Sequence, residues 1–172
     1  MQSITISRRK NLLHKEFSKI YNKEADNAYF SPGRVNLIGE HIDYNGGLVM
    51  PCAITFGTYL LVSPNGDNLL RFRSLNFDDK LDIPLQQKYS KTAESWFNYP
   101  LGIIEYFLED GHPLRGLDML FYGDIPISSG LSSSASIEVV TAFALNELLD
   151  CGYSKLDLVK LSKSVENNFI GF

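Results

Sequence analysis

The sequence predicts a single mixed α+β domain, because segments with helical and with strand-like hydrophobic spacing alternate along its 172 residues. Apolar residues recur at helical spacing over residues 9–21, 96–108 and 132–149, whereas residues 58–62 and 117–122 form short apolar runs typical of strands. No internal repeat, low-complexity tract or linker interrupts this pattern. A chain of this length buries about 70% of its unfolded surface, which is enough for a real core.

The helical segments carry their own boundary signals. In the first, residues 9–21, the apolar residues share one face: Leu12, Leu13, Phe17, Ile20 and Tyr21. Pro100 in the second segment fits best in a first turn, so that helix should begin close before it. A last helix should begin at Ser154, because Asp157 three residues later forms an acidic relative of the capping box.

The strand-like runs predict a sheet that contains a hairpin. Residues 58–62 and 69–73 flank the turn Pro64-Asn65-Gly66-Asp67, a pattern typical of a β-hairpin. Further short strands are predicted over residues 28–30, 81–85 and 117–122.

The composition excludes several classes of protein. With 44% hydrophobic and 21% charged residues, the chain contains no run near the roughly 18 apolar residues of a membrane span. Its start lacks the apolar region and cleavage site of a signal peptide. The net charge of -4 and the scattered basic residues argue against nucleic acid as a partner. Cys52 and Cys151 show no C-x-x-C spacing and do not suggest a disulfide framework, so we expect a cytoplasmic protein. The lack of a long apolar run predicts that it has no membrane partner.

The polar stretch from Ser31 to Tyr44 reads S-P-G-R-V-N-L-I-G-E-H-I-D-Y. We interpret it as a loop that presents hydrogen-bonding side chains to a polar ligand. Glu40, His41 and Asp43 suit the hydroxyl groups of a sugar, and an arginine, Arg34, suits a transferring phosphate. Two alternatives stay open at this point: a structural turn held by salt bridges, and a metal site that includes His41 and Asp43.

A second stretch, Pro126 to Ala135, follows a predicted strand and opens the helix at 132–149. The first turn of a helix has unpaired N–H groups and the positive end of the dipole, so it binds anions. Three successive serines, Ser132 to Ser134, add hydroxyl groups that suit phosphate and a Mg²⁺ ion. The alternative is an ordinary N-cap in a serine-rich loop. The stretch is neither a Walker A loop nor a Rossmann turn.

Together the two stretches resemble a known family. Residues 33–44 are similar to the galactokinase signature G-R-x-N-L-I-G-E-H-x-D-Y, and 126–135 to the P-x-x-x-G-L-S-S-S-A motif of GHMP small-molecule kinases. Trp96-x-Asn98-Tyr99 resembles the galactokinase segment whose tryptophan lies near adenine. Val165-Glu166-Asn167 resembles the A-E-H/N segment whose glutamate faces Mg²⁺. The resemblance covers about residues 29–172.

This resemblance implies a mixed-sheet GHMP kinase N-terminal domain of the ribosomal protein S5 domain 2-like type over residues 1–172. The galactose-binding signature would occupy 31–44 and the phosphate-binding loop and helix 126–150. The implied reaction transfers the γ-phosphoryl group of ATP to the C1 hydroxyl of galactose, with ATP and Mg²⁺ as cofactors. The implied roles are galactose binding by Glu40, His41 and Asp43; catalysis by Arg34; ATP binding by Gly130, Leu131, Ser132, Ser133, Ser134, Ala135 and Trp96; and Mg²⁺ binding by Ser134 and Glu166.

The chain departs from the family after its last predicted helix. Galactokinases continue into a segment resembling C-G-I-M-D-Q, whose aspartate serves the C1 hydroxyl, and then into a C-terminal domain; the 172 residues contain neither. We therefore expect the isolated chain to be nearly inactive, since losing a general base costs about 10²–10⁴ in rate. Apolar residues at its end, Phe169, Ile170 and Phe172, should be exposed and favour self-association. Alternative functions are a galactose- and ATP-binding regulatory protein without turnover, and a GHMP kinase for N-acetylgalactosamine or another sugar.

Overall fold

The computed structural model describes residues 2–39, 46–126 and 132–171, with side chains from residue 8 onward. In these ranges the elements follow in the order α1 (Gln2–Tyr21), β1 (Asn27–Ile38), β2 (Met50–Pro64), β3 (Leu69–Ser74), β4 (Leu81–Pro84), α2 (Asn98–Glu109), β5 (Leu117–Gly123), α3 (Ser133–Leu149), α4 (Lys155–Val165) and a π-helical turn, η2 (Glu166–Ile170).

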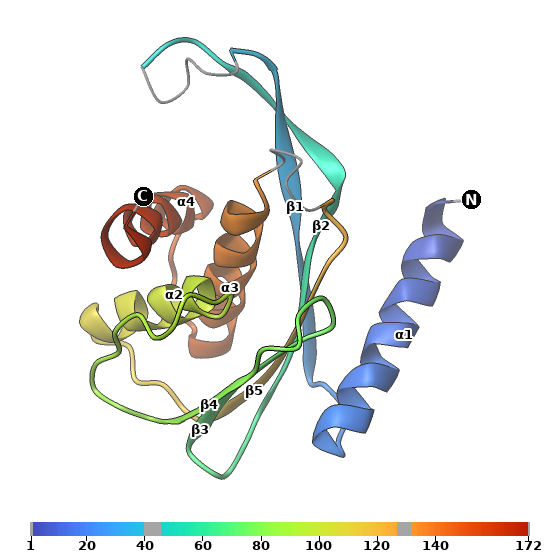
Figure 1. Cartoon of the computed structure of the whole chain (residues 1–172), viewed down its shortest axis with the longest axis vertical. Helices are drawn as coiled ribbons and strands as arrows, with labels where there is room; N and C mark the ends of the chain where they lie inside the picture. Colours follow the sequence, from blue (N-terminus) through green and yellow to red (C-terminus); the bar gives the residue numbers. More distant parts are fainter. Residues whose placement is uncertain (1, 40–45, 127–131, 172) are drawn as a thin grey trace.

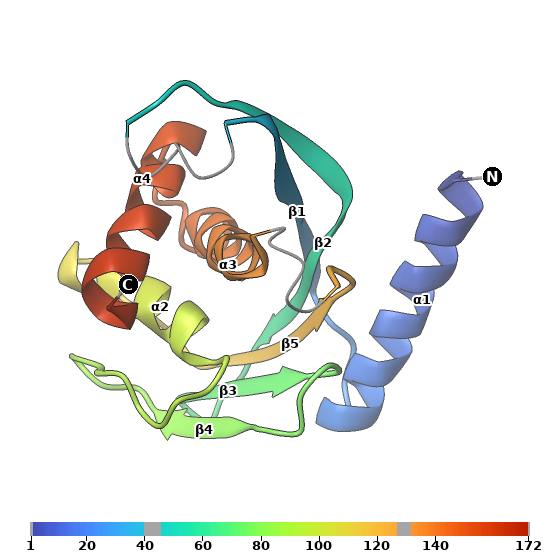
Figure 2. The same cartoon turned by 45° about the horizontal axis from the view of Figure 1, so that its top comes forward.

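The described strands form one five-stranded sheet in the order β1-β2-β5-β3-β4. Strands β3 and β5 run parallel and the other neighbours run antiparallel, so the sheet is mixed. Figure 1 shows α1 on one face of the sheet and α2, α3 and α4 on the other, and the turned view in Figure 2 agrees. The predicted α+β class with a mixed sheet is confirmed.

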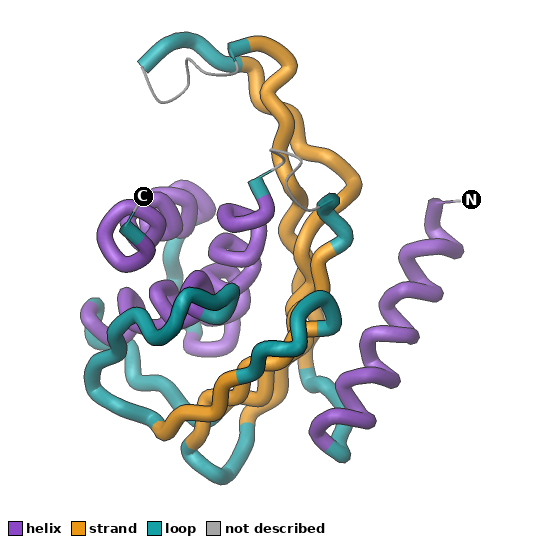
Figure 3. Tube along the Cα trace, viewed as in Figure 1, coloured by secondary structure: helices purple, strands orange, loops and turns teal. Residues whose placement is uncertain are grey.

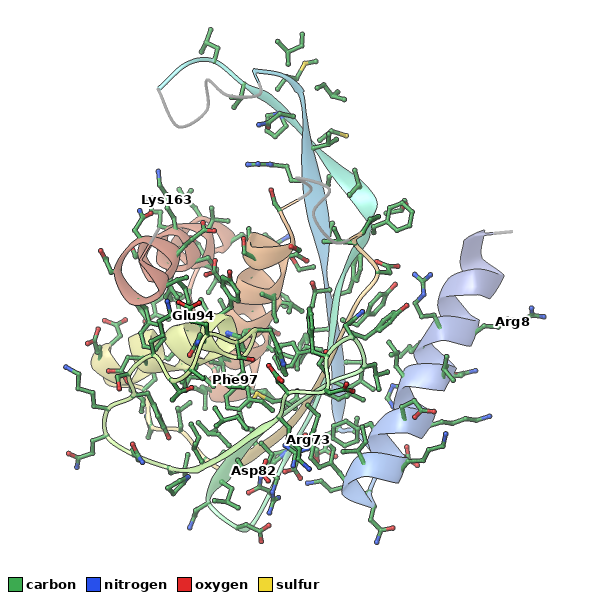
Figure 4. All side chains as sticks on the ribbon, in the orientation of Figure 1. Arg8, Arg73, Asp82, Glu94, Phe97 and Lys163 are labelled. Carbon is green, nitrogen blue, oxygen red and sulfur yellow. The ribbon has the colours of Figure 1, made fainter. Side chains whose placement is uncertain are left out.

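Side-chain alternation along the central strands divides the core between the two faces. Leu60 and Val62 of β2 belong to the large cluster shared with α2, α3 and α4, in which Phe97 is also buried (Figure 4). Leu61 points the other way and pairs in register with Leu120 of β5. The smaller cluster beneath α1 comprises Leu13, Phe17, Leu61 and Leu120.

The predicted hairpin between residues 58–62 and 69–73 is wrong. Strand β5 lies between β2 and β3, so the two strands flanking the turn do not pair with each other. Asn65 explains the outcome, because its N–H donates to Gly116 O (2.9 Å) and its side chain donates to Asp118 Oδ1 (2.9 Å). The turn does reverse the chain direction, but β3 then pairs on the far side of β5. Strand β5 is buried on both faces and occupies the central position of the sheet.

The interpretation of the stretch from Ser31 as a loop is wrong as far as Ile38. Strand β1 continues to Ile38 and pairs with β2 throughout, with register irregularities between Pro32 and Arg34 and between Asn36 and Ile38. The turn dipeptide Pro32-Gly33 is thus accommodated beside an irregularity rather than ending the strand. Figure 3 shows the β1–β2 ribbon rising beyond the rest of the sheet.

The helices differ from the prediction mainly in exposure. α1 begins at Gln2 rather than near residue 9, and two of its predicted core residues, Leu12 and Ile20, are 56% and 40% exposed. α2 begins at Asn98 and holds Pro100 in its first turn, as predicted. In the described ranges, no helix combines the length and the apolar composition needed to cross a bilayer.

The end of the chain is covered better than predicted. Ser154 is the N-cap of α4. Its Oγ accepts a hydrogen bond from the Asp157 N–H, and the Asp157 carboxylate accepts one from the Ser154 N–H, so the capping box is confirmed. Phe169 and Ile170 are half-buried against the large core cluster, which contradicts their expected exposure. Gly102 of α2 permits this approach, because a Cβ there would lie 2.8 Å from the Phe169 ring. This packing weakens the argument for self-association through these two residues.

Candidate functional site

A single serine joins the two polar stretches that the sequence singles out. Ser136 in the first turn of α3 donates from Oγ to Ser31 O of β1 (2.8 Å), and its Oγ lies 2.9 Å from Thr58 Oγ1 of β2. All three residues are buried. The start of α3 is therefore fixed to the strand pair that carries the first polar stretch. Sequence reasoning missed Ser136, because it follows the serine run and looks like an ordinary helix residue.

The side chain of Ser132, the residue before α3, does not cap the first turn of the helix. Ser132 adopts a left-handed conformation (φ 58°), and its side chain makes no capping hydrogen bond. Ser133 is exposed, while Ser134 and Ala135 are half-buried. The geometry thus argues against an ordinary side-chain N-cap at Ser132, and the start of a helix is a favourable place for an anion. Gly130 and Leu131, also predicted to bind ATP, lie outside the described residues.

Ser134 and Glu166 lie together although 32 positions separate them in the sequence. Ser134 Oγ donates to Glu166 Oε1 at 3.1 Å, across the junction between α3 and η2. Hydroxyl and carboxylate oxygens are ligands that suit Mg²⁺, which often uses only one or two carboxylates together with substrate phosphates. Among the described residues there is no cluster of three or more His, Cys, Asp or Glu side chains. The pair therefore fits an ion held partly by a phosphate ligand rather than by a complete protein cage.

A second carboxyl group, Glu138, lies one helical turn below Ser134. It is 1% exposed, and its Oε1 has no hydrogen-bond partner among the described residues. Burial, with a smaller contribution from the charge of Glu166, raises the pKa of Glu138 to about 8. Sequence reasoning missed this residue; the available signal was a glutamate within an otherwise apolar stretch, four positions after Ser134.

An aromatic hollow of about 180 Å³ opens beside the start of α3. Its lining includes Phe77, Trp96, Tyr99, Ser133 and Ser134. Trp96 stacks on Phe77, with ring centroids 6.4 Å apart and an angle of 16° between the ring planes. Trp96 Nε1 donates to Asp79 O (3.1 Å), so the protein itself orients the indole. The lining of the hollow thus combines aromatic side chains, which suit a flat ring, with the first residues of α3.

The first polar stretch is described only in part. Arg34 lies on β1, opposite Ala53 of β2 in the register, and its side chain is exposed. The three residues predicted to bind a sugar, Glu40, His41 and Asp43, lie outside the described residues. The structure therefore describes only some of the predicted site residues: Arg34, Trp96, Ser132 to Ala135 and Glu166.

Comparison with protein families gives two matches. The model described as the galactokinase galactose-binding signature matches residues 15–64, and the model of the GHMP kinases N terminal domain matches residues 98–172. The galactokinase of Streptococcus thermophilus is 46% identical over 162 residues, covering 92% of this chain and 42% of the relative. That of Streptococcus mutans is 47% identical over 166 residues, covering 95% of this chain and 43% of the relative. The chain thus spans less than half the length of these relatives.

Solved structures agree with the sequence comparison. A Lactococcus lactis galactokinase complexed with galactose superposes with a TM-score of 0.86 at 37% identity, covering 94% of this chain and 43% of the other. The Methanococcus jannaschii mevalonate kinase superposes with a TM-score of 0.75 at 24% identity, which shows a shared fold only.

Proposed function

Because this chain belongs to the GHMP kinase family and matches the N-terminal part of the galactokinases, we propose that its site serves phosphoryl transfer from ATP to the C1 hydroxyl of galactose, giving galactose 1-phosphate. The observation that carries the proposal is the meeting of Ser134 and Glu166 beside the aromatic hollow. An anion-binding helix start, a pair of hard oxygen ligands and an aromatic slot match the phosphates, the metal and the base of a nucleotide.

The described residues suggest how the nucleotide is held. The adenine ring enters the hollow against Trp96, and the phosphates lie on the stretch from Gly130 to Ala135. Ser134 and Glu166 hold Mg²⁺, which supplies neutralisation of phosphate charge when bound. Catalysis then rests mainly on positioning, since phosphoryl transfer needs little covalent chemistry from the protein.

On the sugar side, the proposal assigns the galactose hydroxyl groups to Glu40, His41 and Asp43, and the transferred phosphoryl to Arg34. The support is the signature match over residues 15–64, which contains all four residues. The 172 residues contain no segment like C-G-I-M-D-Q, so we propose that this chain alone turns over very slowly. Both cysteines are free thiols, which suits the proposed cytoplasmic location.

Two substitutions, each the control for the other, test the assignment of the two sides. Ser134→Ala is expected to weaken ATP binding in the presence of Mg²⁺ by about tenfold, the loss of one hydrogen bond to a charged group, and to leave galactose binding unchanged. Asp43→Ala is expected to do the reverse. Calorimetric titration of each variant with ATP and with galactose measures both affinities.

If both substitutions left both affinities unchanged, the proposed site would be wrong. Tight binding of galactose and ATP with no galactose 1-phosphate formed by the intact protein would instead favour a regulatory protein. Preference for N-acetylgalactosamine in a panel of sugars would show that this sugar, rather than galactose, is the substrate.

A further inference from the structure

The buried glutamate below the Ser134–Glu166 pair has no role in the site as proposed so far. Ser134 and Glu138 are four residues apart on α3, so they share one face of the helix, with Glu138 about 6 Å further along the axis. That face meets α2 and η2, because Ser134 contacts Glu166 of η2 and the charge of Glu138 helps raise the pKa of Tyr99 on α2. Glu138 thus lies between α3, α2 and η2, deeper in the protein than the Ser134–Glu166 pair.

One oxygen of this buried carboxyl group, Oε1, is left unsatisfied by the described residues. No cation pairs with it in any salt bridge of the described residues, and its Oε1 lacks a hydrogen-bond partner there. Leaving a buried carboxyl oxygen unpaired costs free energy that an apolar residue at this position would avoid. A buried glutamate that is present despite this free-energy cost points to a ligand that supplies the missing hydrogen-bond donor or positive charge.

The missing partner has to be a hydrogen-bond donor or a positive charge that enters from the Ser134–Glu166 side. The opposite side of α3 is closed by the buried contacts of Ser136 with β1 and β2. A hydrated divalent cation satisfies both requirements, because Mg²⁺ keeps several of its waters when it is bound by few protein ligands. Water on such an ion is a strong donor, and a buried carboxylate is a strong acceptor.

We propose that Glu138 is a positioning residue of the cation site, and that it accepts a hydrogen bond from a water molecule on a divalent cation held by Ser134 and Glu166. This inference rests on the proposed function, which assigns that pair to the cation. It adds a carboxylate in the second layer around the ion. Such a group orients the ion and its ligands, and its removal typically weakens metal affinity by 10–100-fold.

The test measures cation affinity without any turnover. Tb³⁺ replaces Mg²⁺ at oxygen sites and emits when nearby aromatic rings are excited, and Tyr99 and Trp96 lie in the lining next to Ser134. Because the pair is only a partial ligand set, the titration is made with ADP present, and the wild-type chain is expected to give a saturable Tb³⁺ signal that Mg²⁺ displaces. Glu138→Gln keeps the shape of the side chain and is expected to weaken Tb³⁺ binding by 10–100-fold. Glu147→Gln makes the same substitution at an exposed position of the same helix and should change the affinity less than twofold.

A melting curve without added cation separates a local effect from unfolding. Glu138→Gln should melt no lower than the wild type, because the substitution removes an uncompensated buried acid. Wild-type affinity for Tb³⁺ in a folded Glu138→Gln variant would overturn this inference while leaving the nucleotide site intact. A wild-type chain with no Mg²⁺-displaceable signal would overturn both this inference and the assignment of the cation to Ser134 and Glu166.

Discussion

Replacing Asp118 with asparagine is expected to lower the free energy of unfolding by roughly 3 kcal/mol, the lower end of the range for a broken buried ion pair. Asp118 of β5 is 3% exposed and accepts from Lys23 Nζ (2.7 Å), Arg71 Nη1 (2.9 Å) and Asn65 Nδ2 (2.9 Å). These contacts tie the end of α1, the central strand and β3 together. Lys23 and Arg71 keep some access to water, so water can partly solvate their charges after the substitution. This is why we expect the lower end of the range.

The same contacts set a pH dependence. Burial alone would raise the pKa of Asp118, but hydrogen bonds from Lys23, Arg71 and Asn65 outweigh it and hold the pKa below the usual value. A carboxyl group whose pKa is lower in the folded state contributes stability above its unfolded pKa of about 3.9, and that stability is lost as the pH falls through the folded value. The wild type should therefore lose stability below about pH 4 more steeply than Asp118→Asn.

Urea unfolding at pH 7 and at pH 3 measures both effects. Asp67→Asn is the matched control, because Asp67 also pairs with Arg71 but its side chain is 59% exposed, and an exposed pair contributes at most about 1 kcal/mol. Equal losses for the two variants at pH 7 would show that the buried charge at Asp118 does not hold these elements together.

Replacing Gly57 with alanine is the second large change, and it acts on the site as well as on stability. A Cβ at Gly57 would lie 2.1 Å from Ser31 O, which also accepts the hydrogen bond from Ser136. The Gly57 N–H donates to Asp124 Oδ1 (2.7 Å), and Asp124 forms a salt bridge with Arg9 of α1. Gly57 thus lies where both polar stretches and α1 meet.

Overpacking typically costs about 1–3 kcal/mol, and we expect the upper end at Gly57 because the clash is with backbone. The displaced Ser31 carbonyl should also release Ser136 and with it the start of α3, so ATP affinity should fall by about tenfold, the loss of about one hydrogen bond. Gly66→Ala is the control, because a Cβ there meets nothing within 4 Å. Chemical unfolding and calorimetric ATP titration of the two variants measure the difference. A Gly57→Ala chain with wild-type stability and ATP affinity would contradict this account of how the two stretches are joined.

The sequence predicts local structure well where the determinants are themselves local. The capping box at Ser154, the place of Pro100 in α2 and the strand at Leu117–Gly123 depend on residues close to one another in the chain. The hairpin failed because local turn chemistry cannot reveal that a strand some 50 positions later would pair between its two arms. The order of strands in the sheet depends on which strand can be buried on both faces, and β5 is that strand.

The candidate site likewise contains residues that the sequence predicts and residues that only the folded structure brings to attention. Ser134 and Glu166 could be predicted from two sequence motifs, and the structure brings the two side chains within hydrogen-bond distance. Ser136 and Gly57 could not, because their importance lies in contacts with residues distant in the sequence. For Glu138 the sequence offered one signal, a glutamate within an otherwise apolar stretch, but its burial follows only from the packing of α3. The roles assigned to Glu40, His41 and Asp43 stay predictions, since those residues lie outside the described ranges.

The most direct test of the nucleotide site uses the only tryptophan of the chain, Trp96, which lines the aromatic hollow. Titration of the folded 172-residue chain with ATP and Mg²⁺ is expected to produce a saturable change in tryptophan fluorescence that ADP also produces and that galactose alone does not. The Ser134→Ala variant should show the same change at about tenfold higher ATP, the loss of one charged hydrogen bond. A folded chain whose tryptophan fluorescence stays constant up to millimolar ATP would contradict the assignment of the hollow and the start of α3 to a nucleotide.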